Sequence, residues 1–88
     1  MPLIKFYANL RTVVGMKEMT VQGASILAVL GTLAQDFPDL QPFLLEQGQL
    51  HPRVIIILNG QTLDPKTSLE TPVSGQDRLD IFPPISGG

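Results

Sequence analysis

The last two residues of the chain, Gly87 and Gly88, are the ones whose types point most directly to chemistry. They follow Pro83-Pro84, and because proline cannot donate to a strand ladder, residues 84–88 are predicted to form a flexible tail. Such a tail could span at most about 16–18 Å, and glycine lets another backbone approach closely. It would deliver the Gly88 carboxylate, unhindered by a Cβ atom, into the active site of another protein. The alternative interpretation is a frayed terminus without a function.

Conventional catalytic sets are nearly absent from the sequence. There is no cysteine, which excludes a disulfide framework, a thiolate metal site and a cysteine nucleophile. His51 is the only histidine and, next to Pro52, is interpreted as a solvated loop residue rather than a catalytic base. The eight carboxylates are spread along the chain, and no glycine-rich loop could cradle a phosphate. We therefore expect no metal site and no catalysis by the domain alone.

Length, charge and apolar content limit the classes to which this protein can belong. A chain of 88 residues makes one domain. The net charge is −2 and the pI is near 5.0, and six Lys and Arg residues scattered singly make no basic patch, so nucleic acid is not an expected partner. No apolar run approaches the ~20 residues of a membrane span, and the N-terminus lacks a signal-peptide core. We expect a cytoplasmic protein that works with protein partners and not with a membrane.

The first half of the chain predicts a hairpin followed by a helix. Ile4 to Leu10 alternate apolar and polar residues, which indicates a half-buried strand, and residues 17–21 resume that pattern after a loop at Arg11–Gly15. Ser25 is a plausible N-cap, and apolar residues then recur at helical spacing as far as Phe37. Pro38 cannot continue a helix and should end it.

The second half predicts a short helical segment and three strands. Residues 40–44 indicate the helical segment, and residues 46–49 are expected to be a loop. The apolar run 54–58 indicates a strand, and Asn59-Gly60 predicts a tight turn into a short partner strand. A turn at 74–77 leads to the last strand, 79–82. The whole is an α+β arrangement, with one main helix on one face of a mixed sheet of four to five strands.

The strand at 54–58 has a property that folding alone does not explain. A strand covered by one helix should alternate, yet this one is apolar on both faces. Its outward residues, Ile55 and Ile57, together with outward Phe82, would form an exposed apolar patch of the kind found at protein–protein interfaces. The alternative is that the segment 40–45, or a loop, folds over this face.

Two segments resemble the small subunit of molybdopterin synthase and, more broadly, the ubiquitin-like sulfur carriers. They are the N-terminal Ile4-Lys5-Phe6-Tyr7-Ala8-Asn9-Leu10-Arg11 and the ending Phe82-Pro83-Pro84-Ile85-Ser86-Gly87-Gly88. Gly48-Gln49-Leu50, followed by the apolar strand and Asn59-Gly60, also falls where that family has a similar segment. The resemblance implies a β-grasp (ubiquitin-like) domain over residues 1–83 and a functional tail over residues 84–88.

The resemblance also implies a mechanism. A ubiquitin-activating-like adenylyltransferase would use ATP to adenylate Gly88, and sulfur from a persulfide donor would replace AMP to give a thiocarboxylate. The large synthase subunit, in a heterotetramer, would then take the tail and transfer sulfur to the molybdopterin precursor. The domain itself would bind no cofactor.

By the same resemblance, individual residues acquire roles. Gly87 would keep the tail slender. The partner-binding residues would be those where the tail leaves the last strand (Phe82, Pro83 and Pro84, called the tail root below), Ile85, and those of the apolar face. Arg11 would join them by pairing with an acidic group of the partner. This partner-binding set comprises Phe82, Pro83, Pro84, Ile85, Arg11, Ile55 and Ile57. A solvated Arg11 worth at most ~1 kcal/mol is the alternative for that residue.

Three other functions fit the same residues. Related carriers serve cysteine, thiazole and tRNA-thiolation pathways with the same tail chemistry, and some have an extended loop where residues 47–52 lie here. A protein modifier would join Gly88 to a lysine of its target. A plain binding module would use only the face around residues 54–58 and leave the tail idle.

Overall fold

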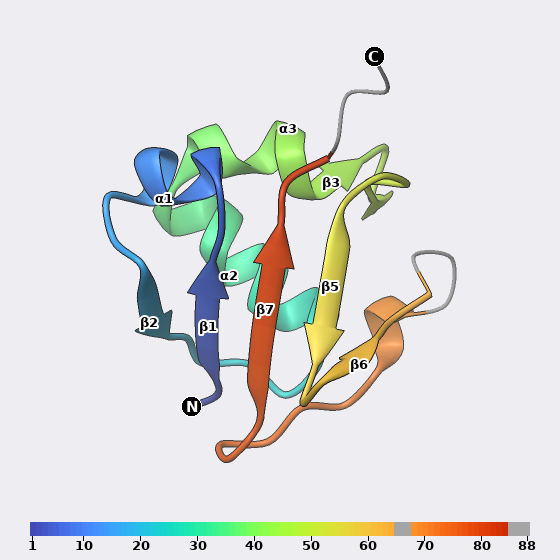
Figure 1. Ribbon diagram of the computed structural model, residues 1–88. Helices are drawn as coiled ribbons and strands as arrows, with labels where there is room; N and C mark the ends of the chain where they lie inside the picture. The colour runs from blue at the N-terminus through green and yellow to red at the C-terminus, as the bar shows by residue number, and fades with distance from the viewer. Residues whose placement is uncertain (65–67, 85–88) are drawn as a thin grey trace.

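One mixed sheet with helices packed on a single face forms the fold of this computed structural model, which describes residues 1–64 and 68–84 (Figure 1). The order of the strands across the sheet is β2-β1-β7-β5-β6. In chain order the five strands are β1 (Leu3–Phe6), β2 (Glu18–Thr20), β5 (Ile55–Leu58), β6 (Gln61–Thr62) and β7 (Arg78–Phe82). The predicted α+β class and the mixed sheet are confirmed.

The first and last strands of this sheet pair with each other at its centre. β1 and β7 are parallel, in a register that places Ile4 beside Leu79 and Phe6 beside Ile81. The other pairs, β1 with β2, β7 with β5, and β5 with β6, are antiparallel. Parallel strands need a long crossover connection, and the helices that lie between β2 and β5 in the chain cover the sheet behind this central pair (Figure 1).

The helical layer follows from local signals in the sequence. It consists of α1 (Asn9–Val14), α2 (Ile26–Asp36) and α3 (Gln41–Leu44), with the 3₁₀ turns η1 (Pro38–Leu40) and η2 (Ser68–Glu70). As predicted, Ser25 caps α2: its hydroxyl oxygen accepts a hydrogen bond of 3.1 Å from the backbone N–H of Ala28. The helix ends before Pro38, also as predicted. None of the helices in the described part of the chain is both long and apolar enough to cross a bilayer.

The core lies between α2 and the sheet. Alternate residues of β1 and β7 point toward it, and one stripe of α2 meets them because apolar residues recur every three or four positions. The central side chains, all less than 2 % exposed, are Ile4, Phe6, Ile26, Val29, Leu30, Leu33, Ile56, Leu79 and Ile81.

The predicted antiparallel pairing of the two N-terminal strands is confirmed, but the first strand is shorter than predicted and the predicted loop is wrong. β1 ends at Phe6, and the segment interpreted as the end of the strand and the loop Arg11–Gly15 contains the helix α1. Ala8 takes a positive φ of 54°, which stops the strand. Leu10 and Val14 then enter the core from one side of α1, because residues four apart share a helix face.

The segment predicted as a loop at 46–49 is a small hairpin. β3 (Leu45–Glu46) pairs with β4 (Gln49–Leu50) in a sheet of its own, through a turn at Gln47 and Gly48 with φ values of 54° and 78°. The predicted Asn59-Gly60 turn is confirmed by a second such pair of positive φ values, 51° and 87°. Asn59 also bonds Asp77, which ties this turn to the predicted turn at 74–77.

Leu30→Ala tests the assigned core face of α2. The side chain is fully buried, so truncation should leave a cavity and lower the free energy of unfolding by about 2–5 kcal/mol. Leu27→Ala is the matched control, because Leu27 lies on the same helix and is 46% exposed; its cost should be under about 1 kcal/mol. Equal losses for both variants in urea denaturation would contradict the assignment.

Candidate docking face and tail root

Within residues 1–64 and 68–84, no helix lies over the sheet face turned away from α2, and this face is called the open face below (Figure 1). Ile55 and Ile57 lie on this face, one on each side of the buried Ile56, and the strand register places Ile55 beside Phe82. The predicted apolar patch therefore exists, as a group formed by Ile55, Ile57 and Phe82 that is called the apolar row below. Its side chains are half-buried rather than exposed, because β5 lies between two neighbouring strands whose side chains flank the row.

The alternative that residues 40–45 fold over this row is wrong. The side chains of Leu40 and Leu44 are at most 1 % exposed and belong to the main core. Their elements, η1 and α3, pack against α2 on the opposite side of the sheet. This segment extends the helical layer and leaves the open face uncovered among the described residues.

A stack of three side chains sits where the tail begins. The ring of Tyr7, which follows β1, lies parallel to the ring of Phe82 with 4.3 Å between centroids and 10° between planes. The guanidinium carbon of Arg11 lies 5.6 Å from the centroid of the same Tyr7 ring. Arg11 is held there by a 3.0 Å hydrogen bond from its Nε to the carbonyl oxygen of Phe6. Ring stacking and cation–π contact each contribute on the order of 1 kcal/mol.

A polar network fixes the other end of the Tyr7 side chain. Its hydroxyl donates a 3.0 Å hydrogen bond to Oδ1 of Asp80, and Arg78 donates to both carboxylate oxygens of Asp80 at 3.2 and 3.3 Å. Asp80 is only 7% exposed, and a buried charge persists where partners satisfy it. The hydrogen bond to Asp80, followed by burial, raises the pKa of Tyr7 above its usual 10.0. The same carboxylate raises the pKa of Arg78.

The structure brings some of the predicted partner-binding residues together. Arg11 and Phe82 lie on the same tyrosine ring, and Ile55 and Ile57 occupy the strand next to Phe82. Pro83 and Pro84 are half-buried and continue from β7 at the edge where α1 also lies (Figure 1). The remaining predictions, for Ile85, Gly87 and Gly88, fall outside the described residues.

Sequence reasoning missed Tyr7 and Asp80. Both were interpreted as ordinary polar positions of alternating strands, and their contact joins residues 73 positions apart. The signal that could have found them is Asp80 itself, a carboxylate in the middle of an apolar strand, which demands a partner across the sheet.

His51, the one histidine of the sequence, has a structural role. His51 accepts a 3.1 Å hydrogen bond at Nδ1 from the backbone N–H of Arg53, which gives it a role in the turn before β5. Within residues 1–64 and 68–84, no three His, Asp or Glu side chains gather as metal ligands would.

The five-stranded sheet, its central parallel pair and the helix across one face define a ubiquitin-like β-grasp domain. The sequence model of the ThiS family matches residues 4–88, and the chain belongs to that family.

Similar proteins agree with this assignment. The chain is 30% identical to small archaeal modifier protein 3 of Haloferax volcanii, over 97% of its own length and 96% of the relative. It is 36% identical to a protein of Archaeoglobus fulgidus whose name describes a sulfur carrier, over 84% and 85% of the two chains. The solution structure of small archaeal modifier protein 1 from Methanosarcina acetivorans superposes with a TM-score of 0.85 at 31% identity, covering 98% and 94% of the chains. These similarities place the chain among sulfur carriers and ubiquitin-like modifiers.

The titration of Tyr7 tests the network at the tail root. Tyr7 is the only tyrosine of the chain, so tyrosinate absorbance near 295 nm reports on it alone. We expect a midpoint above 10.0 in the wild type and a lower one in Asp80→Asn, because the charged acceptor that favours the protonated phenol is gone. Circular dichroism at each pH restricts the comparison to folded protein. Identical midpoints in the two proteins would contradict the hydrogen bond.

Proposed function

We propose that this protein carries sulfur on its C-terminal carboxylate, that an adenylyltransferase activates Gly88, and that the acceptor of the sulfur is the large subunit of molybdopterin synthase. The observation that carries the proposal is that the ThiS-family match to this β-grasp domain runs from residue 4 to residue 88 and so includes Gly87-Gly88, which Ile85 and Ser86 separate from Pro84. The domain supplies recognition, and the partner enzymes supply the catalysis.

The chemistry explains why a carboxylate can serve as a sulfur carrier. A carboxylate is a poor electrophile, so its oxygen first attacks the α-phosphorus of ATP and pyrophosphate leaves. The terminal sulfur of a persulfide then attacks the acyl carbon, and AMP departs. A thiol cleaves the resulting acyl disulfide, is itself oxidised to a disulfide, and leaves the thiocarboxylate on Gly88. ATP belongs to the activating enzyme in this scheme, and the carrier needs no cysteine of its own.

The position of the tail root limits how the partner can bind. Four residues follow Pro84 in the sequence, and a chain of that length extends at most about 13–14 Å. An enzyme that reaches Gly88 must therefore lie against the domain close to Phe82. The open face is adjacent to that point and presents an apolar row, which supports its use as the docking surface.

The choice of molybdopterin synthase rests on the ending. Phe82-Pro83-Pro84, two further residues and Gly-Gly resemble the ending of the small synthase subunit. Co-purification of the tagged protein from its host should recover a large synthase subunit. Recovery of a cysteine-synthase-like enzyme or a tRNA thiolase in its place would reassign the acceptor and keep the carrier chemistry.

One residue appended after Gly88 tests the reacting group. With an activating enzyme, ATP and a sulfur donor, the wild type should gain the mass difference between sulfur and oxygen, and the extended protein should gain nothing because its last carboxylate is misplaced. Its melting temperature should equal that of the wild type, since termini add little to a packed core. Thiocarboxylate on an extended protein that is demonstrably untrimmed would refute the proposal.

A substitution in the apolar row tests the docking face. Ile57→Ser should raise the KM of the activating enzyme for the protein about 10-fold, because a central apolar contact is lost. Leu27→Ser is the control: this leucine is also accessible, but it lies on α2 in the opposite layer. Equal KM values for the two variants would remove the open face from the proposal.

A second candidate function is protein modification. It is favoured by the relative at 30% identity, which is named as a modifier protein. The same activated carboxylate would then be attacked by a lysine amine of a target to form an isopeptide bond. Conjugates of higher mass that survive denaturant and reductant, and that disappear on removal of Gly87-Gly88, would support this function.

A further inference from the structure

Tyr7 contacts three consecutive residues at the end of β7, each through a different group. Its backbone N–H donates a 3.2 Å hydrogen bond to the carbonyl oxygen of Ile81, which continues the pairing of β1 with β7 past the end of β1. Its ring stacks on Phe82, and its hydroxyl donates to Oδ1 of Asp80 at 3.0 Å. Because a tyrosine side chain has few rotatable bonds, rotation of the ring would break at least one of these contacts.

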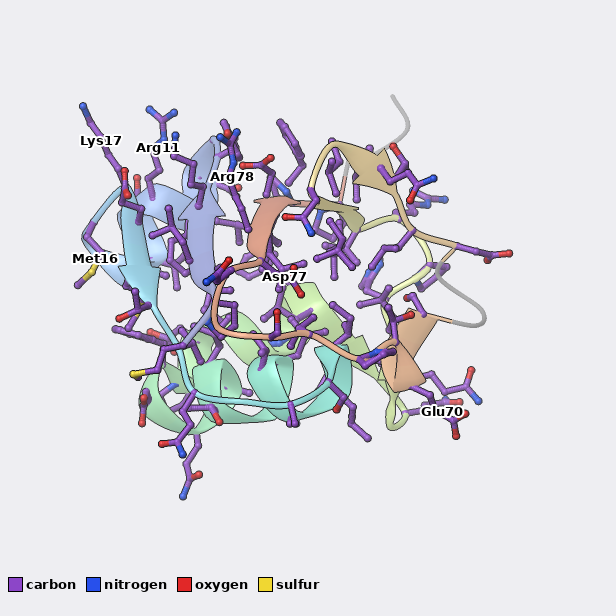
Figure 2. The ribbon with its side chains drawn as sticks, turned by 90° about the horizontal axis from the view of Figure 1, so that it is seen from below. Arg11, Met16, Lys17, Glu70, Asp77 and Arg78 are labelled. Carbon is purple, nitrogen blue, oxygen red and sulfur yellow. The ribbon has the colours of Figure 1, made fainter. Side chains whose placement is uncertain are left out.

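The groups that hold Tyr7 are anchored in turn. Asp80 is 7% exposed, and Arg78 donates to both of its carboxylate oxygens. Arg11 lies over the Tyr7 ring while its Nε donates to the carbonyl oxygen of Phe6. Figure 2 shows Arg11 and Arg78 on the side of the molecule that faces away from the helical layer. A turn of Tyr7 away from Asp80 would leave a nearly buried carboxylate with one partner fewer, which disfavours that turn.

The far end of β7 is fixed by a second set of side-chain bonds. Oδ1 of Asn59 accepts a 2.9 Å hydrogen bond from the backbone N–H of Arg78, and Nδ2 of Asn59 donates one of 2.9 Å to Oδ1 of Asp77. β7 is also the middle strand of the sheet, paired with β1 on one side and with β5 on the other. The chain therefore leaves the sheet from a strand that is held at both ends and along both edges.

Two prolines carry the direction of β7 onward. Pro83 and Pro84 follow Phe82, and the ring of each proline fixes its own φ at about −65°. Few backbone torsions are then free to change between Phe82 and residue 84. The direction of the chain at Phe82 thus constrains where the chain continues.

We propose that Tyr7 is a positioning residue: by holding the end of β7, it sets the direction in which the chain leaves the domain after Phe82 and so orients the Gly88 carboxylate for reaction. This inference rests on the proposed function, because it takes Gly88 as the reacting group. Tyr7 acts through Phe82 and needs no contact with the reacting atoms. A fixed direction raises the rate because fewer orientations of the carboxylate are unproductive.

The hydrogen bond to Asp80 favours positioning over packing as the role of Tyr7. Two apolar rings would fill the same space without a carboxylate that loses solvation on burial. A hydrogen bond to a charged acceptor adds a preferred distance and angle, which contact between ring faces lacks. Tyr7 is thereby held in one orientation, and Phe82, stacked on it with 10° between the ring planes, is held with it.

The direction of the tail root can be measured on the protein alone, from Cα–Hα residual dipolar couplings of Pro83 and Pro84 in a weakly aligned sample. In the wild type these couplings should fit the alignment of the sheet. Tyr7→Leu should lower them by about half or more, because averaging over directions shrinks such couplings. Tyr7→Phe, which keeps the ring and loses the bond to Asp80, should give a smaller fall.

Phe37→Leu is the matched control for these couplings. It also removes a half-buried aromatic ring, one that packs against the core at the end of α2. The couplings of Pro83 and Pro84 should keep their wild-type values in this variant. Wild-type couplings in Tyr7→Phe would overturn the proposal, as would an equal fall in Phe37→Leu.

The kinetics of thiocarboxylate formation separate positioning from docking. Tyr7→Leu should lower kcat about 10- to 100-fold, because a misdirected carboxylate reacts slowly even in the bound complex. Its KM should stay within about 2-fold of the wild type, in contrast to Ile57→Ser, for which KM rises. Tyr7→Phe should recover most of the lost kcat. A raised KM with an unchanged kcat in Tyr7→Leu would assign Tyr7 to docking and overturn the proposal.

The two measurements also distinguish failure of this inference from failure of the proposed function. The couplings need no enzyme, so their loss in Tyr7→Leu, together with a wild-type protein that gains no sulfur from any activating enzyme, would refute the carrier function alone. A wild-type kcat in a variant whose couplings have collapsed would refute the positioning role alone.

Discussion

The parallel pairing of β1 with β7 is the constraint on which the rest of this structure depends. It joins the two ends of the chain at the centre of the sheet, with Lys5 beside Asp80 and Phe6 beside Ile81. Since the two strands run in the same direction, the segments that follow them leave from the same edge (Figure 1). That edge therefore holds both α1 and the beginning of the tail. The contacts of Tyr7 with Phe82 and Asp80 are consequences of this one register.

The same pairing explains why the described helices lie on one face of the sheet only. The crossover that parallel strands require places the helices behind the sheet, and the described residues form no second helical layer in front of it. The open face must then satisfy its own polar groups. It does so with the Tyr7–Asp80–Arg78 network, which keeps a nearly buried carboxylate paired while apolar side chains flank it. A face of this kind combines an apolar row with oriented charges and is suited to a protein partner.

In both proposed functions the domain binds the partner enzyme and the tail carries the reacting carboxylate. In these proposals a short tail suffices because the proposed docking residues on β5 and α1 lie close in space to Phe82 at the end of β7. A rigid root also narrows the directions in which a short segment can leave, and the stack of Arg11, Tyr7 and Phe82 provides such a root. Orientation of this sort contributes to reactivity without placing any catalytic group on the carrier.

Features coded by neighbouring residues could be predicted from the sequence. Ser25 caps α2 and Pro38 limits it, because a side-chain oxygen and a missing N–H act within one turn. Asn59-Gly60 makes its turn since both residues tolerate a positive φ. The apolar run at residues 54–58 indicated both a strand and a row on its outer side. The chemistry assigned to Gly87-Gly88 also comes from residue types alone, and it stays a prediction because these residues lie outside the described part of the chain.

Features that depend on distant partners could not be predicted in the same way. The alternation from Ile4 to Leu10 fits a long strand as well as a strand followed by a helix; only burial of Leu10 and Val14 in the assembled core decides for α1. The role of Tyr7 likewise depends on the register of strands more than seventy residues apart. The sequence by itself determined the cap of α2, its end before Pro38, the Asn59-Gly60 turn and the strand that follows residue 54, and it predicts a reactive group at Gly88. The tertiary structure alone decided which side chains lie around Phe82, the last residue of β7, because strand pairing is selected by the packing of the whole core and not by nearest neighbours.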